Sequence, residues 1–90
     1  MTADAKATEF QIFLSGLASN ALMHLGEIPY PETNEAQVNL PLAGQTIDIL
    51  SMLREKTRGN LNTEEDELFE RLLYDLRVRY VNRSSSENDS

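Results

Sequence analysis

The stretch from Ile47 to Leu61 most constrains the fold, because it holds the end of one helix, its terminator and the link to the next helix. Before Gly59, apolar residues recur every three or four positions and fall in an arc of roughly 160° at 100° per residue. Asn39 is a favourable N-cap, and Pro41 is tolerated in the first turn, where its missing N–H has no helical partner. We therefore predict a helix that starts after Asn39 and ends before Gly59, with positive φ at Gly59.

Two further segments show helical periodicity. From Thr8 to Leu25 the apolar residues are spaced by three and four over four turns, and Gly26 follows as a terminator. A third helix opens at Thr63 with an approximate capping box that closes on Asp66, and its apolar side chains cover about 140°. The expected core positions are Phe10, Phe13, Leu14, Leu17, Ala18, Ala21, Leu22 and Leu25 in the first helix, Leu40, Leu42, Thr46, Ile47, Leu50, Leu53 and Thr57 in the second, and Leu68, Phe69, Leu72, Leu73, Leu76 and Tyr80 in the third.

The connections set the expected fold class. Pro29 and Pro31 exclude a helix between Glu27 and Val38, so the first connection is a long ordered loop. The second is tight, which favours antiparallel neighbours. We predict an all-α, three-helix antiparallel arrangement forming one domain over residues 8–81. Residues 1–7 are expected to be flexible, and the serine-rich residues 82–90 to be disordered.

Composition excludes several function classes. The chain of 90 residues has a net charge of −7, no cysteine and one histidine. This charge argues against nucleic-acid binding and against docking on anionic lipid, because both need clustered Lys and Arg. Thiolate metal sites and disulfides are unavailable. No signal peptide or apolar run long enough for a membrane span is visible. We expect a cytoplasmic protein without cofactor, metal or catalytic residues.

Two short motifs carry a resemblance to a known family. They are Leu-Gly-Glu-Ile-Pro at residues 25–29 and Lys-Thr-Arg-Gly-Asn-Leu at residues 56–61. With the leucine pattern between them, they resemble a small bacterial family catalogued as domain of unknown function 1844, over about residues 10 to 81. Gly44 departs from the basic residue that members commonly carry there. The resemblance implies a cytoplasmic bacterial helical domain and no particular reaction.

Three polar residues invite a chemical interpretation. Asp48 lies about 140° from the centre of its helix's apolar stripe. It is either a general base or metal ligand, or part of a solvated face; the second is favoured, because no carboxylate or histidine lies one turn away. His24 is either a pH-sensitive contact or a partly buried histidine stabilised by the helix C-terminus. Lys56 follows no glycine-rich segment and closes a helix, so it does not belong to a phosphate-binding loop.

Arg54 lies near the middle of the apolar arc, where a charge needs a partner. We predict an intramolecular carboxylate from the loop, namely Glu27, Glu32 or Glu35. A carboxylate of an acidic binding partner is the alternative.

The hypotheses for function belong to three classes. The first is a protein-interaction module that forms homo-oligomers or docks a partner's helix; the second is a small ligand-binding or enzymatic domain using Asp48, Arg54 and Lys56. The third is a nucleic-acid accessory protein using the arginines near the C-terminal end. We favour the first and expect a homo-oligomer, because so small a core leaves little surplus stability. The residues proposed for contact on the back of the first helix are Ile12, Gly16, Ser19 and Met23. Competing faces are Ile49 with Met52, and Tyr74 with Val78 and Val81.

Overall fold

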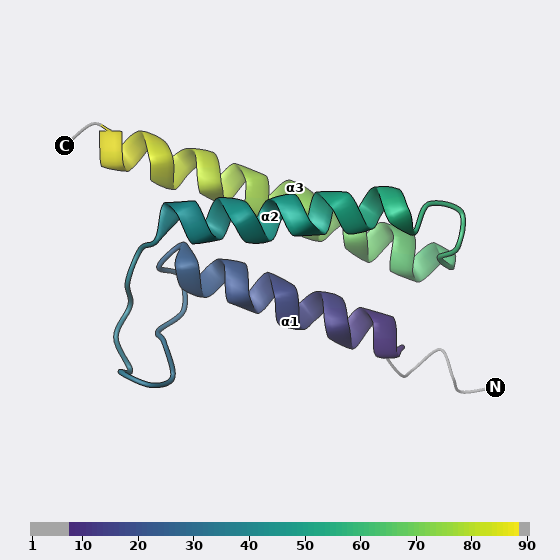
Figure 1. Cartoon of the computed structure of the whole chain (residues 1–90), viewed down its shortest axis with the longest axis horizontal. Coiled ribbons are helices and arrows are strands. Elements are labelled where there is room, and N and C mark those ends of the chain that lie inside the picture. Colours follow the sequence, from purple (N-terminus) through teal and green to yellow (C-terminus); the bar gives the residue numbers. More distant parts are fainter. Residues whose placement is uncertain (1–7, 89–90) are drawn as a thin grey trace.

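A computed structural model describes residues 8–88 as three helices, α1 (Glu9–His24), α2 (Leu40–Lys56) and α3 (Thr63–Asn88) (Figure 1). Successive helices are antiparallel, so α1 and α3 run in the same direction (Figure 1). Each helix packs against the other two. The all-α, three-helix antiparallel prediction is therefore confirmed. The segment 1–7, which was expected to be flexible, lies outside the described residues.

The first helix starts with a complete capping box. The Thr8 hydroxyl accepts a hydrogen bond from the Gln11 backbone N–H, and the Gln11 side chain accepts one from the Thr8 N–H. This arrangement satisfies two donors that a helix N-terminus otherwise leaves unpaired. The helix ends at His24, and Gly26 has φ +81°. A glycine allows this left-handed turn without the Cβ clash of other residues.

The second helix begins and ends as predicted. The Asn39 side chain accepts a hydrogen bond from the Leu42 N–H, and Pro41 lies in the first turn. After Lys56 the chain makes one more turn, closed by a bond from the Asn60 N–H to the Thr57 carbonyl. Gly59 occupies that turn with φ +85°, which confirms the predicted positive φ.

The third helix differs from the prediction at its start. Asn62, immediately before Thr63, is the cap: its side chain accepts from the Glu65 N–H, and the Glu65 carboxylate accepts from the Asn62 N–H. The predicted box from Thr63 to Asp66 is therefore wrong by one residue. Asparagine is as good a cap as threonine, and glutamate is the preferred third residue of the box.

The third helix also extends further than expected. The predicted disorder from Asn82 is wrong over the described residues, because α3 continues to Asn88. No glycine or proline follows Gly59 to break the helix. The side chain of Arg83 is held near Glu27 of the loop, which gives this turn a tertiary contact. The prediction of disorder rested on the low apolar content of residues 82–90, which gives no information about this contact.

The core lies where the three helices meet. Its buried members are Leu14, Ala18, Ala21, Leu25, Ala43, Ile47, Leu50, Phe69, Leu73 and Leu76. Two predicted core residues are largely exposed instead, Phe13 at 53% and Leu42 at 41%. Both lie at the edge of an apolar arc, beyond the width that the neighbouring helices cover. Their exposure matters for the surfaces described below.

The loop of residues 25–39 is ordered by backbone contacts. Isolated bridges join Leu25 to Val38 and Tyr30 to Glu35. The Asn39 N–H donates to the His24 carbonyl at 2.7 Å, so the end of α1 lies beside the start of α2. This geometry places the loop at one end of the bundle (Figure 1).

Candidate interaction surfaces

Arg54 joins α2 to α3. Its Nη1 lies 2.6 Å from Asp66 Oδ1 and its Nη2 lies 2.8 Å from Glu70 Oε2, while only 12% of its side chain is exposed. The guanidinium also sits over the Phe69 ring, 5.6 Å from the centroid. The hydrogen bond to Glu70 is the main cause that raises the pKa of Arg54 above its ordinary value, and Asp66 adds to it. Arg54 is thus engaged within the chain.

The predicted class of partner for Arg54 is correct, but the predicted residues are wrong. The carboxylates come from α3, because Arg54 lies near the C-terminal end of α2 and the loop adjoins its N-terminal end. Of the three loop residues, Glu27 pairs instead with α3 arginines. Sequence spacing does not reveal which helix turns lie opposite one another, so this pairing needed the tertiary structure.

Asp48 lies in an open groove between α2 and α3. The groove, of about 410 Å³, is lined by Gly44, Ile47, Asp48, Arg77, Tyr80 and Val81. A Cβ on Gly44 would lie 3.4 Å from the Tyr80 ring, so the glycine lets this ring approach α2. The Arg77 guanidinium donates to the Ser51 hydroxyl at 2.6 Å. Asp48 is exposed, as expected for a solvated position.

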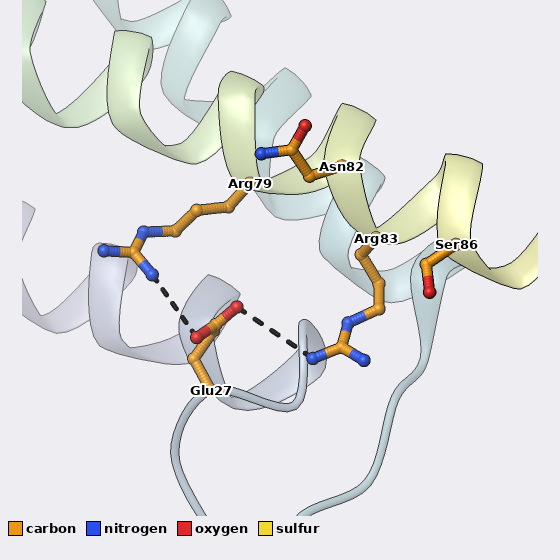
Figure 2. Close-up of a pocket in the computed structure, with 5 residues that line it drawn as sticks. All are labelled: Glu27, Arg79, Asn82, Arg83 and Ser86. Atoms are coloured by element: carbon orange, nitrogen blue, oxygen red, sulfur yellow. Dashed lines mark ion pairs between the residues drawn. The ribbon is translucent and has the colours of Figure 1, made fainter.

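A second hollow holds a small ionic network. Figure 2 shows the Glu27 carboxylate between the guanidinium groups of Arg79 and Arg83, with Asn82 and Ser86 on the same part of α3. The distances are 3.3 Å to Arg79 and 4.0 Å to Arg83. A hydrogen bond to Asp75 is the largest cause that raises the pKa of Arg79, and Glu27 contributes less. These ion pairs connect the loop to the C-terminal part of α3.

The other polar candidates lie apart from these groups. His24 Nδ1 is 2.9 Å from the Tyr30 hydroxyl, and the two rings meet edge to face. Lys56 is exposed at the C-terminal end of α2, whereas His24 lies beside the N-terminal end of that helix. Within residues 8–88, no group of three His, Cys, Asp or Glu is placed to hold a metal ion. His24 is therefore tied to the loop, away from Asp48 and Lys56.

The largest exposed apolar side chains of α1 and α2 form what we call the α1/α2 face. Its members are Ile12 (62% exposed), Phe13 (53%), Leu42 (41%), Ile49 (40%) and Met52 (46%). Asn20 of α1 and Leu42 of α2 line one hollow. Phe13 precedes Asn20 by two helical turns, and Ile49 follows Leu42 by two turns. Because the helices are antiparallel, Phe13 and Ile49 lie at a similar level along the two helices (Figure 1).

The predicted contact residues of α1 differ in how exposed they are. Ile12 and Gly16 are exposed, and a Cβ added to Gly16 would meet nothing within 4 Å. Ser19 is also exposed, whereas Met23 is half-buried in the hollow beneath the loop. Phe13 was missed as a surface residue because its spacing also fits the core stripe.

Charge is distributed unevenly over the helices. From Phe10 to Gly26 the chain contains no Asp, Glu, Lys or Arg, and from Ala36 to Leu53 it contains only Asp48. That aspartate faces the groove on the α3 side of α2. Most charged residues lie instead on α3 and at the end of α2. The α1/α2 face is thus apolar, and exposed charged residues of these two helices border it only at its ends: Glu9 lies one turn before Phe13, and Lys56 one turn after Met52.

In the part of the chain that the structure describes, no helix has both the length and the apolarity needed to cross a membrane. The chain matches no curated protein and no solved structure. A family model, described as domain of unknown function (DUF1844), matches residues 7–82. This range includes α1, α2 and most of α3, and the chain therefore belongs to the DUF1844 family.

Proposed function

We propose that the protein is a self-associating interaction module. The observation that carries the proposal is the α1/α2 face, where five large apolar side chains are 40–62% exposed on a surface that charged residues of these helices border only at its ends. Exposed apolar patches mark interaction sites on soluble proteins, and interface centres are depleted of charged residues.

The ionic contacts support the same assignment by elimination. The ligand-binding or enzymatic alternative requires Asp48, Arg54 and Lys56 to act together. At 100° per residue, Arg54 points roughly 120° away from Asp48 and roughly 160° away from Lys56 around α2. Arg54 is already paired with Asp66 and Glu70. These three residues therefore do not converge on one ligand.

The nucleic-acid alternative is weakened in a similar way. Arg77 donates to Ser51, and both Arg79 and Arg83 face Glu27. Arg77 points roughly 160° away from Arg79 around α3. Arg79 is also paired with Asp75. Phosphate binding needs a continuous basic surface, which this arrangement does not provide.

The test is the mass of the purified chain in solution. Multi-angle light scattering from 1 to 200 μM should give at least twice the 10.2 kDa chain mass at the upper concentrations. Raising NaCl from 50 to 500 mM should strengthen association, because salt screens the repulsion between copies that each carry −7 and does not weaken apolar contacts.

Two results would contradict the proposal. A mass near 10 kDa at every concentration and salt level would show that the chain is a monomer. A complex that dissociates as salt rises would show that ion pairs, rather than the apolar face, hold the copies together.

A further inference from the structure

We infer that two copies pair through the α1/α2 face about a two-fold axis near Gly16, with α1 of one copy antiparallel to α1 of the other. This inference rests on the proposed self-association and adds the face, the occupant and the geometry. The occupant is a second copy of this chain.

Gly16 has no role within the single chain that would explain a glycine. It lies in the middle of α1, it is exposed, and it is not among the residues with positive φ. An added Cβ would meet nothing within 4 Å, so alanine would fit and would favour the helix. A glycine in such a place allows the backbone of another helix to approach closely. In an antiparallel pair centred there, Gly16 of each copy faces Gly16 of the other.

The positions around Gly16 suit a two-fold contact. Ile12 lies one turn before Gly16 and Ser19 one turn after it, on the same side of α1. A two-fold axis at Gly16 brings the large Ile12 of each copy against the smaller polar Ser19 and Asn20 of the other. Such self-complementarity is what an isologous interface requires, since one patch must fit itself.

Electrostatics selects this face over the rest of the surface. Two copies that each carry −7 repel one another. They approach at least cost through a surface poor in carboxylates. From Phe10 to Gly26 the chain has none, and Glu9, in the first turn, is the one acidic residue of α1. The competing apolar stripe of α3, formed by Tyr74, Val78 and Val81, lies on a helix with charged residues throughout.

The area is sufficient for a specific dimer. Taking roughly 200 Å² for a fully exposed large side chain, the five members of the face expose on the order of 500 Å² per copy. Complete burial of all five on both copies would remove about 1,000 Å² from solvent. Specific interfaces start near that value, and the small polar neighbours add to it.

Disulfide trapping tests the geometry directly. The chain has no cysteine, so Gly16→Cys introduces a single thiol at a position with room for it. A two-fold axis near residue 16 brings the two Cα atoms within the ~7 Å that a disulfide tolerates. Mild oxidation should convert most of Gly16→Cys into a covalent dimer. Val78→Cys, on the exposed stripe of α3, is the matched control and should remain largely monomeric on a denaturing gel.

Charge substitution tests the face without cross-linking. Ile12→Glu with Phe13→Glu should weaken the dimer at least ~100-fold, because four carboxylates would be buried in it. Tyr74→Glu with Val78→Glu adds the same charge to equally exposed positions of α3 and should change the dissociation constant less than about threefold. Circular dichroism should show unchanged helicity in both, since all four side chains are at least 40% exposed in the single chain.

The outcomes separate this inference from the proposed function. A monomeric parent chain would overturn both. An oligomer that survives the α1 charges, dissociates with the α3 charges, or cross-links through Val78→Cys rather than Gly16→Cys would overturn the inference and leave self-association standing. Gly16→Leu gives a further check without added charge: it should raise helicity and still weaken the dimer at least ~10-fold, and an unweakened dimer would exclude close approach at Gly16.

Discussion

Alanine substitutions at Gly59 and Gly26 should separate the backbone cost of a left-handed residue from the cost of a steric clash. The two glycines have nearly equal φ values, +85° and +81°. Their surroundings differ, because a Cβ at Gly59 would meet nothing within 4 Å, whereas a Cβ at Gly26 would lie 2.8 Å from Val38 Cγ2. Alanine at Gly59 therefore measures the backbone cost alone, whereas alanine at Gly26 measures the backbone cost and the steric clash together.

The expected magnitudes follow from these distances. Gly59→Ala should lower the free energy of unfolding by about 1 kcal/mol, since a left-handed conformation costs an alanine ~1–2 kcal/mol, partly offset by a less flexible unfolded chain. Gly59→Val should cost more, because a β-branched side chain tolerates positive φ poorly. Gly26→Ala should cost about 2–4 kcal/mol, the additional part being the ~1–3 kcal/mol typical of overpacking.

A double-mutant cycle with Val38→Ala isolates the clash. Urea unfolding at one fixed, low protein concentration should show favourable coupling of about 1 kcal/mol or more between Gly26→Ala and Val38→Ala. The matched cycle of Gly59→Ala with Val38→Ala should be additive within ~0.5 kcal/mol. Additivity in the Gly26 cycle, or no loss of stability for Gly59→Ala, would refute the reasoning.

Three further substitutions test the contacts that join and start the helices. Arg54→Met should cost about 1–2 kcal/mol in urea unfolding, a modest value because the partner carboxylates are 52% and 66% exposed, and the difference from the parent should shrink in 1 M NaCl. Asn62→Ala should cost about 1 kcal/mol by removing the cap of α3, and a loss below ~0.3 kcal/mol would contradict the capping role. Arg58→Gln should return the pKa of Glu55, which its hydrogen bond to Arg58 lowers, toward the ordinary value of 4.5 in an NMR titration. Because the folded-state pKa of Glu55 is lowered, the ion pair stabilises the fold above pH 4.5, and this stabilisation is lost as the pH falls through the folded-state pKa. The variant should therefore lack this part of the acid destabilisation. An unchanged Glu55 titration would contradict the ion pair.

Much of the fold could be predicted from local chemistry. The start of α2 depends on Asn39 and Pro41, and its end on Gly59, and each acts within a few residues of its own position. The apolar spacing of three and four identified all ten buried core residues except Ala43, which lies inside the apolar arc of its helix. These features are readable because capping, left-handed turns and helical periodicity are properties of neighbouring residues.

The candidate face could be predicted only in part. Ile12 and Gly16 were identified as surface residues because they lie opposite the apolar stripe of α1. Phe13 was not, because a residue at the edge of a stripe is covered only if a neighbouring helix reaches it. Its exposure at 53% depends on where α2 lies.

The tertiary structure alone decided which distant residues meet. The sequence shows that Arg54 needs a carboxylate and that residues 82–88 are poor in apolar side chains, and both statements are correct. The sequence does not show that Asp66 and Glu70 lie opposite Arg54. Nor does it show that Glu27 pairs with Arg83 in the C-terminal part of α3. The physical reason is that caps and periodicity act over one or two turns, whereas these pairs form only when three helices have packed at a particular register.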